Sequence, residues 1–140
     1  MIGELLHAFN EEFDDPTPGP EFIAARARDL VSSDAATFLL VGDPPVGIAM
    51  VRFRETVWSD KLDAHLEELY VVPERRGEGL GRALLERVLD LVRERGAGRI
   101  DLGTAVDDRA ARALYEALGF TNFEKPGDPG TRMLFYEREL

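Results

Sequence analysis

Residues 71–85 read VVPERRGEGLGRALL, and the organisation of the rest of the chain can be read outward from this turn. A short apolar strand runs into three glycines, Gly77, Gly79 and Gly81, which open an apolar helix. Glycines let the backbone curl and remove side chains that would hold an anion away. Because the first N–H groups of a helix lack internal acceptors, the turn predicts an anion-binding site.

The spacing of these glycines does not fit the two commonest phosphate motifs. A P-loop needs Lys and Ser or Thr where Arg82 and Ala83 stand, and a dinucleotide fingerprint needs Gly-x-Gly-x-x-Gly. The residues match Arg-x-x-Gly-x-Gly instead, with Arg76, Gly79 and Gly81. A helix-entry turn that binds nothing is the alternative interpretation.

The strand that leads into the turn changes its parity. The apolar residues in 62–66 follow one alternation, whereas those in 69–71 follow the other. A change of parity within one strand is typical of a β-bulge, which can turn two consecutive side chains towards one cleft. The bulge is expected at Glu67 and Glu68.

The remaining periodicity predicts an alternation of helices and strands. Helices are expected over residues 2–13, 21–32, 80–95 and 108–118, and strands over 37–41, 46–54, 62–72, 100–106 and 131–139. The order is therefore ααβββαβαβ. The strand–helix–strand unit within 62–106 should be a right-handed crossover, which makes its two strands parallel.

Composition narrows the functional classes. The 140 residues fit a single domain, residues 1–140, and the absence of cysteine excludes disulfides, zinc–thiolate sites and a cysteine nucleophile. Two histidines make a histidine-rich metal centre hard to build, so no metal is expected. A net charge of −10 disfavours nucleic-acid binding and suits cationic partners. No membrane span or secretory signal is seen, which indicates a cytoplasmic protein.

The turn resembles the pyrophosphate-binding motif of the GNAT superfamily, the acetyl-CoA-dependent N-acetyltransferases. Residues 108–120, DRAARALYEALGF, are similar to that family's Asn-x-x-Ala-x-x-Leu-Tyr-x-x-x-Gly-Phe helix. The resemblance covers about residues 37–139. It implies an α/β (α+β) fold of the acyl-CoA N-acyltransferase type: a mixed, mostly antiparallel sheet with a central, splayed parallel strand pair, flanked by helices. The family's first strand has no counterpart before residues 2–13, so we expect an open sheet edge and consider a homodimer.

The resemblance also implies where acetyl-CoA binds. Backbone amides from Arg76 to Arg82 would hold the pyrophosphate, and Leu69 and Val71 would bond the pantetheine arm between splayed strands. The positions in the turn are Arg76, Gly77, Glu78, Gly79, Leu80, Gly81 and Arg82. Asp108 stands where the family commonly has Asn, so it either contacts the cofactor or only caps the helix.

Acyl transfer to an amine needs a base for the amine and a proton for the leaving thiolate. The resemblance implies that Tyr115 supplies that proton, although a packing role is the alternative. Glu68 or Glu67 could be the base, with His65 as another candidate. Because cysteine is absent, direct transfer within a ternary complex is favoured over a thiol-linked intermediate.

The acceptor is expected near the variable segments. Trp58 could form an aromatic wall for a cation, together with Phe9 or Phe13, although covering the core edge is an equally good explanation for Trp58. The sequence thus predicts an N-acetyltransferase acting on a primary amine of a small molecule or peptide. A non-catalytic acyl-CoA sensor is the alternative, and a nucleotide-binding domain is a third interpretation.

Overall fold

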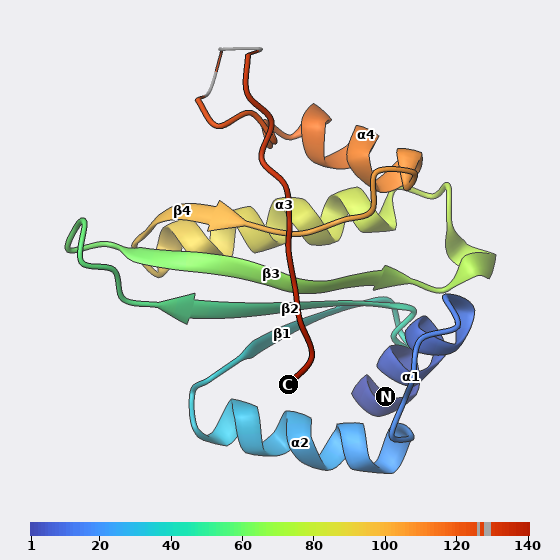
Figure 1. Cartoon of the computed structure of the whole chain (residues 1–140). Coiled ribbons are helices and arrows are strands. Elements are labelled where there is room, and N and C mark those ends of the chain that lie inside the picture. The colour runs from blue at the N-terminus through green and yellow to red at the C-terminus, as the bar shows by residue number, and fades with distance from the viewer. Residues whose placement is uncertain (126, 128–129) are drawn as a thin grey trace. The chain divides into compact units, whose positions relative to one another are not determined.

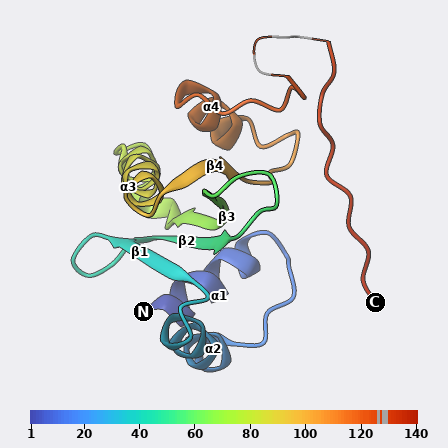
Figure 2. The same ribbon diagram turned by 90° about the vertical axis from the view of Figure 1, so that its left-hand side faces the viewer.

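The computed structural model describes residues 1–125, 127 and 130–140 in two compact units, Met1–Leu102 and Gly103–Leu140. Figures 1 and 2 show the chain in two orientations. The elements of the first unit are α1 (Ile2–Glu12), α2 (Pro20–Ser32), β1 (Thr37–Val41), β2 (Gly47–Arg54), β3 (Leu62–Val71), the 3-10 helix η1 (Pro73–Arg75), α3 (Leu80–Glu94) and β4 (Ala97–Asp101). The second unit contains α4 (Arg109–Ala117).

The first unit is built on a four-stranded sheet of order β1-β2-β3-β4. β1 and β2 form the expected antiparallel hairpin, β2 and β3 are antiparallel, and β3 and β4 are parallel across α3. The mixed sheet and its parallel crossover pair confirm the predicted fold class. The strand expected over residues 100–106 lies earlier, because β4 begins at Ala97 and ends at Asp101, and residues 102–106 are not strand. Gly96, with φ +79°, turns the chain directly out of α3, so pairing starts opposite Leu62.

Helices cover both faces of this sheet. In Figures 1 and 2, α3 lies on one face, and α1 and α2 lie on the other. The apolar side chains of α3 that face the sheet recur at helical spacing and are buried. Residues Gly47 to Val51 of the central strand β2 are also buried, on both faces of the sheet. The largest of the fully buried side chains are Ile48, Val51, Leu85 and Val88. On the α1 face, Leu5 packs with Ile48 and Tyr70.

The register of β2 and β3 contains the expected bulge. Met50 pairs with Glu68 and Val51 pairs with Leu66, so Glu67 is an extra residue in β3. The change of parity in the sequence therefore marked the correct position. Before Glu67, the odd-numbered residues of β3 point to one face of the sheet. After Glu67, the even-numbered residues point to that same face.

The second unit departs from the sequence prediction at its end. α4 forms as expected, with the Asp108 carboxylate accepting a hydrogen bond from the Ala111 amide at 3.1 Å. The strand predicted over residues 131–139 is wrong for the described residues, which form only an isolated bridge between Phe123 and Arg132. A strand needs a partner along its length, whereas Tyr136 is 84% exposed.

No helix within the described residues has the length and apolar character that crossing a membrane would require.

Candidate active site

The glycine-rich turn ends in a run of unpaired amides. The Arg76 amide donates to Pro73 O at 3.3 Å, and the Ala83 amide donates to Gly79 O at 3.0 Å. Between them, the amides of residues 77–82 reach no acceptor among the described residues. Gly77 and Gly79 both have φ of +80°, and a Cβ on either would meet nothing within 4 Å. The turn thus presents six backbone donors at the open start of α3.

These donors suit an anion with several oxygens. The amino end of α3 adds the positive end of a helix dipole, and its N-cap, Gly79, makes no side-chain capping bond. Nearby carboxylates are held by basic side chains, with Arg75 paired to Glu78 at 2.8 Å and Arg82 to Glu86 at 3.0 Å. The donors begin at Gly77 rather than at Arg76, because the Arg76 amide is already used. Diphosphate binding at this turn stays a prediction.

The edge of β3 that faces away from β2 begins at this turn and runs back along the sheet. The Val72 amide donates to Val46 O at 2.9 Å, so antiparallel alternation turns the backbone groups of Leu69 and Val71 away from β2. The pairing of β3 with β4 ends at His65 and Asp101. In the part of the chain that the structure describes, β3 therefore has no strand partner on this side from Glu67 onward.

The Arg76 side chain joins this edge to α1. Its Nε donates to Val71 O at 3.0 Å, and its Nη2 donates to both carboxylate oxygens of Glu12, at 2.9 and 2.8 Å. The guanidinium also lies 5.6 Å from the centroid of the Tyr70 ring, which stacks on Phe9 at 4.9 Å. The carboxyl end of α1 is thereby fixed beside the turn.

The bulge gives two neighbouring carboxylates different environments. Arg52 on β2 forms an ion pair with Glu67, which lies exposed on the sheet. Glu68 is half-buried, and its pKa is raised to about 7, first by burial and then by the charges of Glu67 and Asp15. Glu68 can therefore accept and release a proton near neutral pH. The sequence already favoured Glu68 over Glu67 as the base, and the two carboxylates have different environments in the structure.

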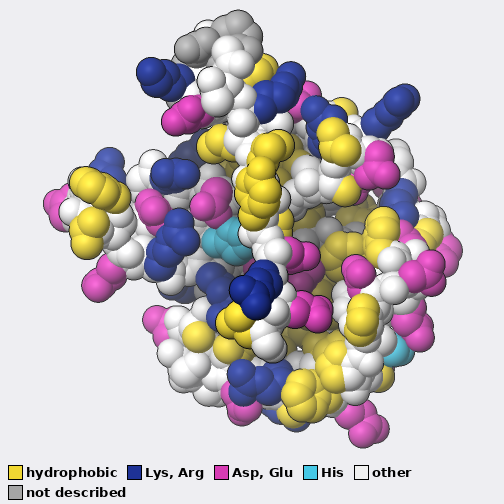
Figure 3. Space-filling model, in the orientation of Figure 1, with side chains coloured by type: hydrophobic (Ala, Val, Ile, Leu, Met, Phe, Trp, Pro, Cys, Tyr) yellow, Lys and Arg dark blue, Asp and Glu magenta, His cyan; other side chains and the backbone are white. Residues whose placement is uncertain are grey.

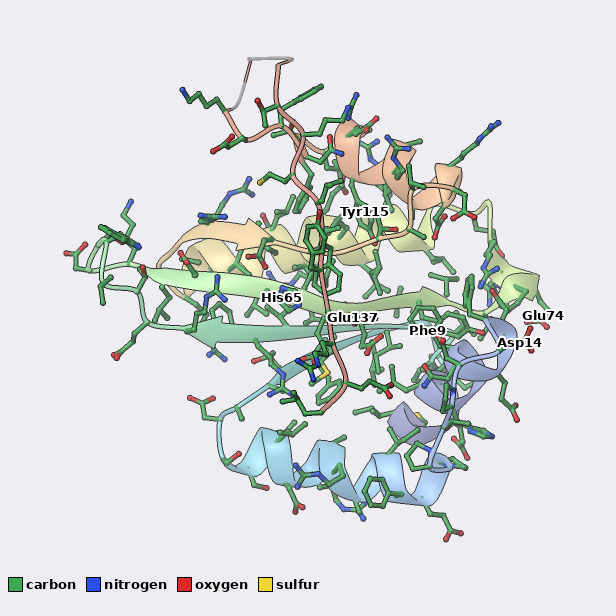
Figure 4. All side chains as sticks on the ribbon, in the orientation of Figure 1. Phe9, Asp14, His65, Glu74, Tyr115 and Glu137 are labelled. Carbon is green, nitrogen blue, oxygen red and sulfur yellow. The ribbon has the colours of Figure 1, made fainter. Side chains whose placement is uncertain are left out.

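His65 has a partner that sequence reasoning missed. Its Nδ1 lies 2.5 Å from Asp101 Oδ1, and Arg54 lies 3.6 Å from Asp101 and 3.7 Å from Asp63. Figure 4 labels His65 on β3, and Figure 3 shows histidine on this face with acidic and basic side chains around it. The only signal in the sequence was an acidic residue inside the apolar run of residues 100–102.

Tyr115 belongs to the second unit, on α4. Burial raises the pKa of its hydroxyl, and the Asp108 carboxylate raises it further. The hydroxyl therefore remains protonated at neutral pH, as a proton donor must. The ring lies 5.9 Å from that of Phe120.

The structure does not bring Trp58 and Phe13 together into one wall, and a contact of either side chain with the acceptor stays a prediction. Phe13 makes an edge contact with Phe9, whose ring stacks on Tyr70 near the carboxyl end of β3. Trp58 is 90% exposed. It belongs to the loop between β2 and β3, which Figure 1 shows at the end of β3 away from α1. The stretch of β3 from Asp63 to Tyr70 alone spans about 24 Å at ~3.4 Å per residue.

Comparisons with known proteins find a family model, related sequences and similar folds. Residues 2–120 match the model of the acetyltransferase (GNAT) family. A crystal structure from Arthrobacter sp. FB24, of a protein assigned as an acetyltransferase, is 43% identical, with a TM-score of 0.88 over 99% of this chain and 88% of that one. The structure of the NatC complex bound to Gag peptide and CoA is 28% identical, with a TM-score of 0.54 over 57% of this chain and 50% of that one.

Among curated proteins, a mycothiol acetyltransferase of Beutenbergia cavernae is 45% identical over 69 residues, which are 47% of this chain and 23% of that protein. The chain spans about half or less of the length of the curated relatives that it matches.

Proposed function

Because the chain belongs to the acetyltransferase (GNAT) family, we propose that it transfers an acetyl group from acetyl-CoA to a primary amine of a small molecule or a peptide. The observation that carries the proposal is that three features of the first unit follow one another in space. Bare amides over residues 77–82 lie next to an unpaired edge of β3, and that edge leads to Glu68.

The residues of this chain fit the cofactor at its diphosphate and along its pantetheine arm. The amides of residues 77–82 would hold the diphosphate, with the side chains of Arg76 and Arg82 nearby. Backbone groups of Leu69 and Val71 would bond the amides of the pantetheine arm, as one strand bonds another. Asp108 already caps α4, and a contact with the cofactor would be additional. When bound, acetyl-CoA supplies an activated thioester.

The direction of β3 determines where the acyl end arrives. An arm that starts at the turn and follows the free edge passes Val71 and then Leu69 before it reaches the bulge. From Val71 to Glu67 the strand spans about 14 Å at ~3.4 Å per residue. The acyl group would then lie beside Glu68, just short of the point where β3 and β4 come together at His65 and Asp101.

At this position Glu68 acts as the general base. A primary alkylamine arrives as an ammonium ion, which cannot attack a carbonyl carbon. The Glu68 carboxylate removes one proton, directly or through a water molecule, and leaves a lone pair on nitrogen. The C–N bond would then form as the C–S bond breaks. The Tyr115 hydroxyl would give its proton to the departing thiolate and take back, directly or through water, the second proton that the nitrogen loses on becoming an amide. We propose direct transfer because the chain has no cysteine to carry the acyl group.

The surroundings of Glu68 favour a cationic acceptor. Asp15 and Glu67 are both close enough to raise the Glu68 pKa, and the chain carries a net charge of −10. Phe13 remains a candidate contact for the acceptor, since it packs against Phe9 beside this region. Trp58 would contact only an acceptor that extends to the far end of β3.

The test is thiol release from acetyl-CoA with a panel of monoamines, diamines and short peptides, with mass spectrometry to locate the acetyl group. Thiol release with an acetylated amine supports the proposal. Tight binding of CoA without thiol release for every amine would favour the acyl-CoA sensor. Tighter binding of ATP or NAD than of CoA would favour the nucleotide-binding interpretation.

A further inference from the structure

The hydrogen bond between His65 and Asp101 defines the tautomer of this histidine. A carboxylate oxygen can only accept, so Nδ1 of His65 carries the proton that bridges the 2.5 Å to Asp101 Oδ1. In the neutral ring, Nε2 then holds the lone pair. Nε2 has no hydrogen-bond partner among the described residues, and the side chain is 45% exposed. His65 is therefore oriented as a proton acceptor that faces solvent.

The register places this acceptor at one end of the free edge of β3. His65 and Asp101 are the last residues paired between β3 and β4 before that edge opens. Alternation puts His65 and Glu67 on one face of the sheet, and the bulge keeps Glu68 on the same face. His65 thus lies three residues from the proposed base, on the same strand and face.

The charged groups around this face have defined partners. On β2, Arg52 pairs with Glu67, and Arg54 contacts Asp63 on β3 and Asp101 on β4. From the α1 side, Asp15 acts on Glu68 through its charge. None of these interactions involves Nε2 of His65.

We propose that His65 is a positioning residue that acts through Glu68: its Nε2 accepts, through water, the proton that Glu68 has taken from the amine, and passes it to solvent. The inference rests on the proposed function. In each cycle the ammonium ion loses one proton to the Glu68 carboxylate, the carboxylic acid loses it to Nε2, and the imidazolium loses it to buffer. Glu68 and His65 both return to their starting forms, and Asp101 keeps Nδ1 protonated throughout.

The first experiment needs neither cofactor nor substrate. Nitrogen-15 NMR of the cofactor-free protein should show neutral His65 as the Nδ1–H tautomer. Asp101→Asn should weaken that preference, whereas Asp63→Asn, which removes a carboxylate that contacts only Arg54, should preserve it. A predominant Nε2–H tautomer in the unmodified protein would overturn the relay, because Nε2 would then have no free lone pair.

The second experiment measures turnover of whichever amine supports thiol release, with free imidazole as a replacement base. His65→Gln should lower kcat about tenfold with little change in the KM of the amine, and imidazole should restore most of the rate. Asp101→Asn should show a smaller loss. His7→Gln, which removes the other histidine, should keep the normal rate and show no response to imidazole.

Two outcomes would overturn the relay: an unchanged kcat in His65→Gln, or a loss that imidazole does not restore in a variant with normal circular dichroism. If His65→Gln does not fold, Asp101→Asn tests the relay instead, again by whether kcat falls and whether imidazole restores it. These outcomes differ from a failure of the proposed function, in which the unmodified protein would release no thiol with any amine.

Discussion

At the scale of single residues, identical side chains acquire different chemistry from their neighbours. Glu67 and Glu68 are adjacent carboxylates, but Arg52 pairs with the first while burial and nearby negative charge act on the second. The sequence could predict that both lie at the bulge, because parity is a local pattern. It could not show why their environments differ, because Arg52 and Asp15 come from other elements.

The first prediction concerns the rate. Glu68→Gln should lower kcat about 10²–10⁴-fold, the range for loss of a general acid or base.

In the unmodified protein kcat should rise with pH and level off above about 7, since only the ionised carboxylate is a base. Steady-state thiol release across pH tests both. Glu21→Gln, an exposed change on α2, should keep the normal profile, and a flat profile in the unmodified protein would exclude Glu68 as the base.

The second prediction concerns stability. The Glu68 pKa is about 7 in the folded protein and 4.5 in the reference state, so between these values the folded protein binds more protons and loses stability as pH rises. Glu68→Gln removes this cost. Allowing for its partial exposure, we expect on the order of 1–2 kcal/mol of added stability at pH 8 and almost none at pH 4. Urea unfolding at both pH values measures it, and equal effects would contradict the raised pKa.

The third prediction concerns the proton donor. Tyr115→Phe should lower kcat while leaving CoA affinity nearly unchanged, because only the hydroxyl is removed. Its control is Tyr136→Phe, since Tyr136 is 84% exposed in the same unit. An unaffected rate in Tyr115→Phe would return this residue to a packing role.

At the scale of elements, the sequence predicted features that depend on neighbouring residues well, and it predicted the pairing of strands only in part. The glycine turn, the apolar face of α3 and the bulge were all visible in the sequence, because each depends on residues close together in the chain. The register of β4 depends instead on the geometry of Gly96 and on Leu62, 35 positions from Ala97. Residues 131–139 are a second example. Their apolar residues suggest that the segment can form a strand, but the sequence does not show which strand it would pair with.

The fourth prediction concerns the turn. Gly79→Asp places a side chain and a negative charge at the start of α3, so CoA binding should be lost. Gly96 is a matched control, because it too has a left-handed φ, of +79°, and a Cβ there would also meet nothing within 4 Å. Gly96→Asp should cost a similar ~1–2 kcal/mol of stability but leave CoA affinity unchanged. Calorimetric titration with CoA distinguishes the two variants, and normal binding by Gly79→Asp would exclude the turn.

At the scale of the whole molecule, family membership and fold class could be predicted because two motifs occurred in the right order. The acceptor could not be predicted in the same way. Trp58 and Phe13 illustrate why: each is a plausible aromatic contact, but the length of β3 separates them. Distances between loops depend on tertiary structure, and no local pattern records them.

The fifth prediction joins cofactor binding to folding. A ligand that binds only the folded state stabilises it by about 2.7 kcal/mol at a concentration one hundred times its Kd. CoA should therefore raise the Tm of the unmodified protein and leave that of Gly79→Asp unchanged. Differential scanning calorimetry provides the measurement. An equal rise in both proteins would place CoA somewhere other than the turn.

The open side of β3 has a consequence for handling the protein. Among the described residues, this row of strand amides and carbonyls has no partner strand, and Arg76 covers the Val71 carbonyl alone. Such an edge can pair with a strand of another chain. A ligand lying along the row would occupy the same hydrogen-bonding groups. Preparations kept in CoA should thus stay monodisperse in light scattering for longer than ligand-free ones, because a bound ligand would block strand pairing between copies of the chain.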